Sequence, residues 1–238
     1  MTAETEVIKR LVLLPGLDGT GELFADLVRA LPDTFHARVV GYPSDSFLPY
    51  RDLMTFVQSA APAAEPFVLV AESFSAPLAV QYAAMNPPNL KGLVICAGFV
   101  TGPAKGSRRF IVSLIAPVLF RLPFPGFAIR FFLVGPNAEA PLIAAVRAAI
   151  SSVRPNVLSG RLRDVLACDA RAELAQVAVP ILYLQGERDR LVPASCLDEM
   201  RRIKPEIEVI AIPGPHLILQ REPERAADAI AKFMTQLG

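Results

Sequence analysis

A serine that could act as a nucleophile stands at Ser73, between an apolar, β-prone run and a segment of helical composition. The surrounding stretch, residues 71–75 (Ala-Glu-Ser-Phe-Ser), is a relaxed form of the G-x-S-x-G pattern. That pattern marks a sharp strand-to-helix turn that strains the serine backbone and admits only small residues two positions away. Ala71 and Ser75 are small enough. The stretch therefore predicts either a nucleophile or the N-cap of the following helix.

Two further residue types needed for nucleophilic catalysis occur late in the chain. Asp189 follows a predicted strand over residues 179–185, and His216 follows the next one, over residues 208–212. Because the carboxyl ends of parallel strands meet at one edge of a sheet, both loops should emerge beside Ser73. A serine whose proton is taken by a histidine, itself oriented by an aspartate, attacks acyl carbonyls. We therefore predict a triad of Ser73, Asp189 and His216.

Other ionisable residues near these motifs have simpler interpretations. His36, the other of the two histidines, precedes a short predicted strand and is interpreted as a surface or packing residue. Asp18 is second to Asp189 for an acidic role, and its expected role is to shape a glycine-rich turn. For Glu72, beside the candidate nucleophile, a structural role is sufficient.

The elements that must position these groups alternate between strands and helices. Strands are predicted over residues 6–14, 37–41, 66–72, 90–97, 179–185 and 208–212. Helices are predicted over residues 22–31, 50–61, 73–86, 194–202 and 222–235. Near-continuous apolar strands that alternate with helices are typical of a parallel sheet covered on both faces. The predicted fold class is therefore α/β, with a mostly parallel sheet and helices on both faces.

The alternation stops between residues 102 and 167, where apolar segments punctuated by proline and arginine look helical, including residues 138–153. We interpret residues 102–167 as an inserted helical cap, and residues 1–101 with 168–238 as the core. Seven of the 14 phenylalanines lie between Phe99 and Phe132. They could line an apolar substrate pocket or attach the cap to the core.

Composition is apolar enough to raise the question of a membrane span. Hydrophobic residues make up 53% of the 238 residues, and the mean hydropathy is +0.41. The most apolar region, residues 110–134, is interrupted by Arg121, Arg130 and prolines, which leaves no apolar stretch of about 18 residues. We predict no transmembrane segment. Residues 1–6 lack the basic and apolar regions of a signal peptide, so a cytoplasmic location is predicted.

Cysteine usage and charge restrict the function further. The three cysteines lack the spacing of metal ligands, which favours a reducing compartment. The net charge of +1 gives no reason to predict a nucleic acid partner. Residues 73–138 contain no acidic residue, however, and several basic ones, which form either a local positive patch or a solvated basic face. These are Lys91, Lys105, Arg108, Arg109, Arg121 and Arg130.

Three motifs carry a resemblance to the α/β-hydrolase superfamily over essentially the whole chain. They are residues 71–75, Gly186-Glu187-Arg188-Asp189 with Val192-Pro193, and Gly214-Pro215-His216. Residues 14–21 (Leu-Pro-Gly-Leu-Asp-Gly-Thr-Gly) are similar to the family's oxyanion loop, with Pro15 where many members have histidine. The chain also resembles small capped esterases and acyltransferases. It departs from the pattern in its two missing elbow glycines, in Pro15, and in lacking the N-terminal antiparallel hairpin of larger members.

The resemblance implies an activity and the groups that perform it. Backbone N–H groups of Leu17 and Phe74 would form the oxyanion hole beside Ser73. No metal and no organic cofactor is implied. The expected reaction is hydrolysis of a small-molecule ester or thioester of an apolar acyl group, and the basic cap would suit an anionic acyl carrier. Two alternatives remain open, namely acyl transfer to an alcohol and a receptor of the same fold that binds a ligand without turnover.

Overall fold

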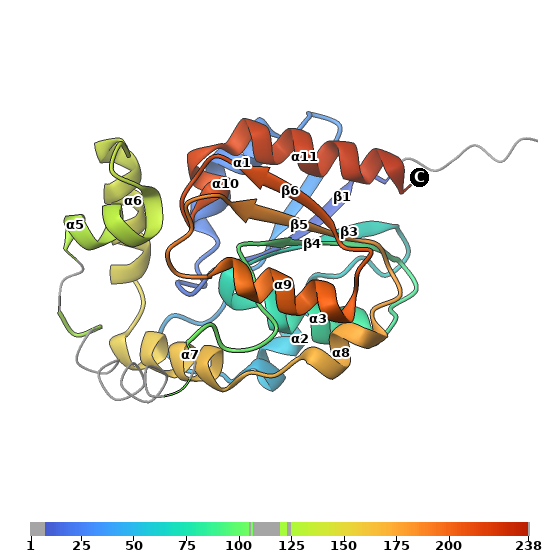
Figure 1. Ribbon diagram of the computed structural model, residues 1–238, viewed down its shortest axis with the longest axis horizontal. Helices are drawn as coiled ribbons and strands as arrows, with labels where there is room; N and C mark the ends of the chain where they lie inside the picture. Colours follow the sequence, from blue (N-terminus) through green and yellow to red (C-terminus); the bar gives the residue numbers. More distant parts are fainter. Residues whose placement is uncertain (1–7, 105, 107–119, 123–124, 238) are drawn as a thin grey trace, which may run out of the picture.

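The computed structural model describes residues 8–104, 106, 120–122 and 125–237. Within these residues, six parallel strands form one sheet in the order β2-β1-β3-β4-β5-β6 (Figure 1). The strands are β1 (Arg10–Leu14), β2 (His36–Val39), β3 (Phe67–Glu72), β4 (Leu90–Cys96), β5 (Ile181–Gly186) and β6 (Glu208–Ile212). The predicted parallel α/β fold is confirmed, although residues 6–7 of the first predicted strand lie outside the described residues.

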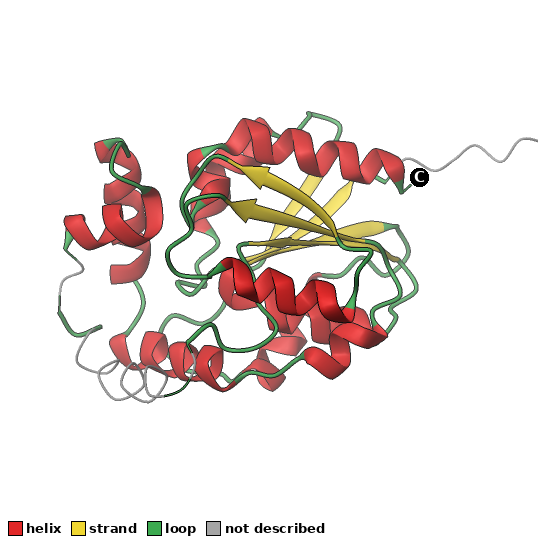
Figure 2. Cartoon of the chain, in the orientation of Figure 1, coloured by secondary structure: helices red, strands yellow, loops and turns green. Residues whose placement is uncertain are grey.

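Helices cover both faces of the sheet (Figure 2). One face packs against α1 (Ala25–Ala30), α10 (Ile218–Arg221) and α11 (Pro223–Gln236). The other packs against α2 (Tyr50–Ala60), α3 (Ala76–Ala84), α8 (Arg171–Gln176) and α9 (Ala194–Ile203). Because both faces are covered, a central strand has no side that faces solvent, and every residue of β3 is buried.

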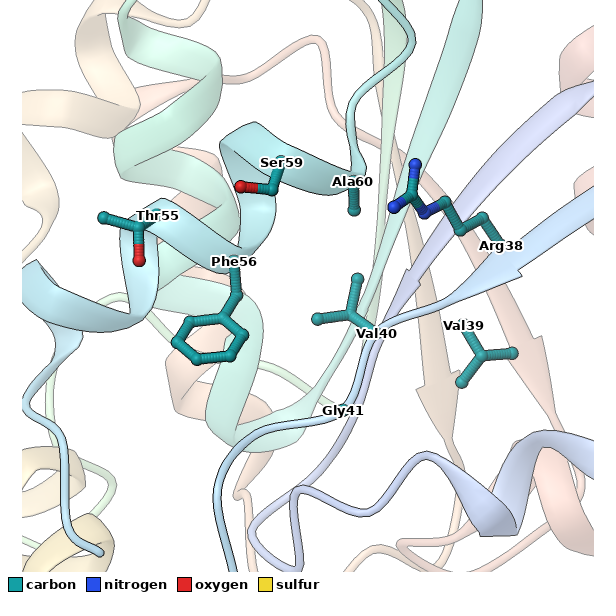
Figure 3. Close-up of a pocket in the computed structure, with 8 residues that line it drawn as sticks. All are labelled: Arg38, Val39, Val40, Gly41, Thr55, Phe56, Ser59 and Ala60. Carbon is teal, nitrogen blue, oxygen red and sulfur yellow. The ribbon is translucent and has the colours of Figure 1, made fainter.

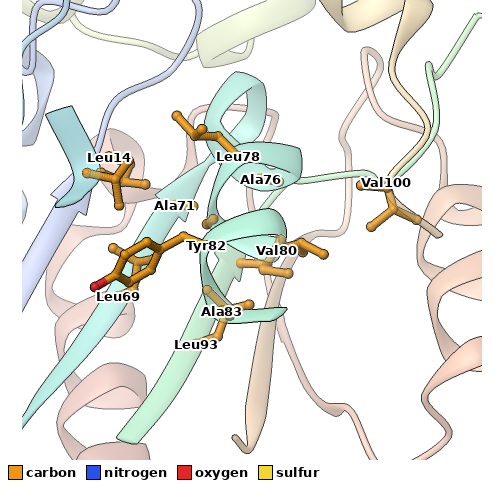
Figure 4. Close-up of a cluster of buried hydrophobic side chains, with 14 of the residues drawn as sticks. Leu14, Leu69, Ala71, Ala76, Leu78, Val80, Tyr82, Ala83, Leu93 and Val100 are labelled. Atoms are coloured by element: carbon orange, nitrogen blue, oxygen red, sulfur yellow. The ribbon is translucent and has the colours of Figure 1, made fainter. Parts of the chain in front are cut away.

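Helix α3 packs directly on the centre of the sheet (Figure 4). Its residues Ala76, Ala79 and Ala83 are buried, and their small side chains let the helix approach β3 and β4 closely. Larger aliphatic side chains such as Leu69 and Leu93 fill the remaining space, and each contributes about 1.5–3 kcal/mol on burial. This packing holds the start of α3, and therefore the turn that carries Ser73, against the sheet.

The chain between β4 and α8 contains helices and no strand among its described residues. These are α5 (Gly126–Ala128), η3 (Ile129–Val134), α6 (Ala140–Ser151) and α7 (Pro155–Ala167). In Figure 1, α5 and α6 lie on the side toward which the arrows of β5 and β6 point. The helices therefore stand where a cap over the carboxyl ends of the strands would stand, and the boundaries 102–167 remain a prediction.

These helices have their own small core, which also holds the loop of His216. Ile129, Val134 and Val146 are buried together with Leu217, which follows His216 in the chain. The N–H of Leu217 also donates to a backbone carbonyl of η3, at 2.9 Å. The helical segment is therefore attached to a loop that carries a candidate catalytic residue.

The described aromatic residues in and near this segment differ widely in burial. Phe127 is 75% exposed and Phe131 is 53% exposed, whereas Phe99 is buried in the main core. Phe110 and Phe124 lie outside the described residues. The guanidinium of Arg190, in the loop after β5, nevertheless lies 4.0 Å from the centre of the Phe131 ring, and Phe120 packs against Val153 and Val157.

Several predicted boundaries differ from those of the structure. His36 begins β2 instead of preceding it, because its N–H donates to Lys9 in the parallel ladder, and its side chain is exposed. The helix predicted over residues 22–31 begins as a tight turn, η1 (Glu22–Phe24), and the helix predicted over residues 73–86 begins as another, η2 (Ser73–Ser75). Helices α7 and α8 had no individual prediction, since neither sequence has a strong apolar period.

The predictions about membrane spans and about the set of basic residues can both be compared with the structure. No described helix is both long and apolar enough to cross a membrane. Lys91 lies near the start of β4, whereas Arg121 and Arg130 follow the other end of that strand. Arg130 donates to the carbonyl of Ala138 at 2.8 Å. The remaining members of the basic set, Lys105, Arg108 and Arg109, lie outside the described residues.

Candidate active site

Ser73 lies in a strained turn where β3 ends and α3 approaches. Its φ is +47°, in the left-handed region that a residue with a side chain adopts at a cost of about 1–3 kcal/mol. Ala71 and Ser75, two positions away on either side, are fully buried, which explains why only small residues fit there. The turn directs the serine out of the sheet edge, as a nucleophile requires.

Ser73, His216 and Asp189 form one hydrogen-bonded chain. The Nε2 atom of His216 lies 2.9 Å from Ser73 Oγ, and its Nδ1 atom lies 2.8 Å from Asp189 Oδ2. The other oxygen of Asp189 accepts the N–H groups of Leu191 and Val192 at 2.8 and 2.9 Å, which fixes the carboxylate. The structure therefore brings together the three residues of the predicted triad, and their catalytic role remains a prediction.

The glycine-rich loop after β1 lies beside the turn of Ser73, because Leu14 pairs with Ala71 in neighbouring parallel strands. Within the described residues, the N–H of Leu17 donates to no protein acceptor. Phe74 lies in the first turn of its helix, where N–H groups have no partner within the helix. Both groups are available for a ligand, as the predicted oxyanion hole requires.

Asp18 shapes this loop, as the sequence predicts. Its Oδ2 atom accepts the N–H of Thr20 at 2.9 Å and the hydroxyl of Thr20 at 2.6 Å. The N–H of Gly19 donates to Gly16 at 3.0 Å, with the left-handed φ of +69° that glycine adopts easily. Asp18 is thus occupied inside its own turn.

A buried arginine from α7 holds the same loop and was missed in the sequence. Arg161 is 1% exposed, and its guanidinium donates to the carbonyls of Leu17, Asp18 and Pro43 at 3.0, 2.6 and 2.9 Å. Its guanidinium also lies 5.7 Å from the centre of the Tyr42 ring. Burial lowers the pKa of Arg161, and the Asp18 carboxylate partly offsets this. No local pattern could reveal this contact, because it joins residues more than a hundred positions apart.

Replacing Arg161 with Met is expected to destabilise the fold by about 2–4 kcal/mol, because buried carbonyls then lack donors. Chemical unfolding in urea, followed by circular dichroism, measures this difference. Arg163→Met is the matched control, since Arg163 is exposed on the same helix. A loss below about 1 kcal/mol for Arg161→Met would contradict the role assigned to the guanidinium.

Ser75 stands where the G-x-S-x-G pattern has its second glycine, and its hydroxyl group forms hydrogen bonds that a glycine could not form. Ser75 Oγ donates to the carbonyl of Pro15 at 2.5 Å and lies 2.8 Å from the hydroxyl of Tyr42. Burial raises the pKa of Tyr42, so its hydroxyl stays protonated and donates to Ser75. Tyr50 donates to the carbonyl of Phe74 at 2.7 Å. The departure from glycine therefore adds bonds that connect the turn to the loop.

Glu72 is buried beside the nucleophile, with its side chain 1% exposed. It accepts a hydrogen bond from Gln220 Nε2 at 3.1 Å, and its other oxygen lies against the backbone of Gly16. Burial, and after it the negative charge of Asp18, raise the pKa of Glu72 to about 7. The structural role predicted for Glu72 is thus accompanied by an ionisation near neutral pH.

The raised pKa of Glu72 makes stability depend on pH. The folded chain holds the proton of the Glu72 carboxyl more tightly than the unfolded chain does. The contribution of protonated Glu72 to stability is therefore complete below pH 4.5 and is lost as pH rises through about 7. Each pKa unit corresponds to about 1.36 kcal/mol. We therefore expect Glu72→Gln to be more stable than the wild type by about 3 kcal/mol at pH 8, and equally stable at pH 4.

Urea unfolding of both proteins between pH 4 and pH 8 measures this difference. Glu208→Gln serves as control, because Glu208 is exposed in β6. A stability difference for Glu72→Gln that does not change with pH would show that the ionisation of Glu72 is not its cause.

A surface pocket of about 390 Å³ lies elsewhere, between β2 and α2 (Figure 3). Its lining includes Arg38 and Val39 from β2, and Phe56 and Ser59 from α2. None of the predicted site residues lines it. It is open to solvent and has no nucleophile paired with a base, so we do not assign the chemistry to it.

Comparison with known proteins agrees with this geometry. The sequence model of the Alpha/beta hydrolase family matches residues 11–229. The pimeloyl-[acyl-carrier protein] methyl ester esterase of Xanthomonas axonopodis pv. citri is 26% identical to this chain, over 95% of each protein. The enzyme of the same name from Methylococcus capsulatus is also 26% identical, over 94% of this chain and 93% of its own.

Solved structures share the fold at lower identity. A thermophilic esterase from Thermogutta terrifontis superposes with a TM-score of 0.78 at 20% identity, over 96% of this chain and 90% of its own. A hydrolase from Oleispira antarctica superposes with a TM-score of 0.80 at 13% identity, over 95% and 90%. The match of the family model to most of the sequence is the decisive finding. The chain therefore belongs to the alpha/beta hydrolase family, as an esterase-like hydrolase.

Proposed function

We propose that this protein is a serine hydrolase that cleaves carboxylic esters or thioesters of apolar acyl groups through an acyl-enzyme on Ser73. The observation that carries the proposal is the hydrogen-bonded chain from Ser73 through His216 to Asp189. A left-handed turn at the serine and available N–H groups beside it support the same conclusion.

The first half of the reaction acylates the enzyme. Ser73 Oγ attacks the acyl carbonyl while His216 Nε2 takes the serine proton, and Asp189 stabilises the imidazolium that forms. The N–H groups of Leu17 and Phe74 donate to the oxyanion of the tetrahedral intermediate. When the intermediate collapses, the bond to the leaving group breaks, and His216 returns the proton to the leaving alcohol or thiol.

The second half releases the acyl group. A water molecule takes the place of the leaving group and attacks the acyl-enzyme, while His216 removes a proton from this water. The second tetrahedral intermediate expels Ser73 Oγ, which recovers its proton from His216. The products are a carboxylic acid and the free enzyme.

The names of the curated relatives suggest a more specific substrate. Those proteins are named as esterases of a pimeloyl methyl ester on an acyl carrier protein. We extend the proposal to an acyl ester that is attached to an acidic carrier. Basic residues outside the sheet, such as Arg121, would attract such a carrier by their opposite charge. We also place the protein in the cytoplasm, because an odd number of cysteines without the spacing of metal ligands favours a reducing compartment.

Hydrolysis of p-nitrophenyl esters from acetate to palmitate tests the proposal. We expect turnover with an optimum at a medium chain length, and a fluorophosphonate adduct that mass spectrometry locates on Ser73. Product analysis with added alcohol separates hydrolysis from acyl transfer, since an acyltransferase forms the new ester. If no ester is cleaved and Ser73 is not labelled, the proposal fails in favour of a ligand-binding receptor.

A further inference from the structure

One buried carboxylate touches the three segments that carry the proposed catalytic groups. Glu72 directly precedes Ser73 in the chain and is almost fully buried. Its carboxylate lies against the backbone of Gly16, in the loop after β1, and this backbone favours the charged form of Glu72. The carboxylate also accepts a hydrogen bond from Gln220 Nε2 at 3.1 Å, from the helix that follows His216. A single side chain therefore connects the nucleophile turn, the oxyanion loop and the histidine segment.

The loop backbone lies directly against this carboxylate. A Cβ atom on Gly16 would lie 3.4 Å from Glu72 Oε2, so the approach leaves little room for a side chain. Leu17, whose N–H is a proposed oxyanion donor, is the next residue in the chain. Since adjacent peptide planes share one Cα, the direction of the Leu17 N–H depends on where Gly16 is held.

Three ionisable groups face Glu72 from different elements. Asp18 faces it from the loop after β1, His216 from the loop after β6, and Cys96 from the end of β4. Burial raises the pKa of Cys96, so this thiol adds no charge near neutral pH. The pKa of about 7 for Glu72 therefore reflects burial and the Asp18 charge, opposed by its hydrogen bonds and by His216.

The two protonation states of Glu72 favour different hydrogen bonds. A carboxylate accepts from Gln220 and attracts the adjacent N–H of the Gly16 backbone, and charge-assisted hydrogen bonds are about twice as strong as neutral ones. The Oε1 atom of Gln220 is buried and accepts no bond from the described residues. A protonated Glu72 could donate to this oxygen after the amide rotates, which would weaken its hold on Gly16.

We propose that Glu72 is a positioning residue, which as a carboxylate holds the Gly16–Leu17 backbone in place beside Ser73. It acts on the rate through the Leu17 N–H and does not itself touch substrate. The inference rests on the proposed function, because the position of this N–H affects turnover only if it stabilises an oxyanion.

Kinetics of Glu72→Ala and Glu72→Gln test this role. We expect Glu72→Ala to lower kcat by about 10²-fold with KM changed less than about twofold, as for a displaced oxyanion donor. Glu72→Gln keeps an acceptor oxygen and should recover most of this loss. In the wild type, kcat/KM should fall as pH decreases through about 7, because Glu72 takes up a proton and holds the loop less tightly. Glu72→Gln should lack this fall.

Glu208→Gln is the matched control and should behave as the wild type. A kcat for Glu72→Ala within about twofold of the wild type, or the same fall in kcat/KM near pH 7 in Glu72→Gln, would overturn the inference.

Amide hydrogen exchange tests the hold on the loop without altering Glu72. In Ser73→Ala, the protection of the Gly16 N–H, corrected for intrinsic exchange, should fall about tenfold as pH decreases from 8 to 6. Protection that does not change across this range would overturn the inference, even if the variants at Glu72 fail to fold. If the wild type cleaves no ester but the protection changes as expected, the proposed function has failed while the hold on the loop stands.

Discussion

Replacing Ser73 with Ala is expected to lower kcat for ester hydrolysis by about 10⁴-fold or more, because no acyl-enzyme can form. The residual rate would come from water attacking substrate that is still bound beside the oxyanion donors. Alanine at φ of +47° is strained about as much as serine, so the variant should keep its stability within about 1 kcal/mol. Steady-state kinetics on the best p-nitrophenyl ester, with urea unfolding alongside, measure both quantities.

Ser75→Ala is the matched control for this experiment. It removes a hydroxyl from the same turn but leaves the proposed nucleophile in place. It loses the bond to Pro15, so a loss of about tenfold through a looser loop is expected. If Ser73→Ala retained more than about a hundredth of wild-type turnover, or if the fluorophosphonate adduct formed elsewhere, Ser73 would not be the nucleophile.

Asp189→Asn should lower kcat by about 10⁴-fold while leaving the fold intact. The carboxylate accepts a hydrogen bond from the N–H at His216 Nδ1, which leaves Nε2 free to accept the proton of Ser73. An amide NH₂ facing Nδ1 would place the ring proton on Nε2 instead, where it cannot act as a base. The amide oxygen can still accept the N–H groups of Leu191 and Val192, so the loop should remain closed.

The same ester assay measures this effect, with Asp198→Asn as control because Asp198 is exposed in the neighbouring α9. Fluorophosphonate labelling of Ser73 should slow in parallel, since it depends on the same base. A kcat for Asp189→Asn within about tenfold of the wild type would show that Asp189 does not orient the histidine.

The stability and rate effects expected at Glu72 have opposite signs. A neutral amide should stabilise the fold at pH 8, where the carboxylate is costly to bury, and should slow turnover only slightly, because an uncharged acceptor holds Gly16 more weakly than a carboxylate does. This combination is what distinguishes a buried group kept for function from one kept for packing.

Much of the fold and of the candidate site could be predicted from the sequence. Apolar strands in alternation with helices imply a parallel sheet, and parallel strands deliver their following loops to one edge. Ser73, Asp189 and His216 each follow such a strand. Their proximity therefore depends on the order of strands and helices, which local sequence patterns reveal. The turn role of Asp18 could be predicted for the same reason, since its partner Thr20 is two residues away.

The groups that hold the site together could be found only in the tertiary structure. Arg161 meets Leu17 across a sequence separation of 144 residues, and Gln220 meets Glu72 across 148. Such contacts depend on how helices pack on the sheet, and neither residue carries a local signal. The pKa of Glu72 likewise depends on complete burial and on the charge of Asp18, both of which arise only when the chain has folded.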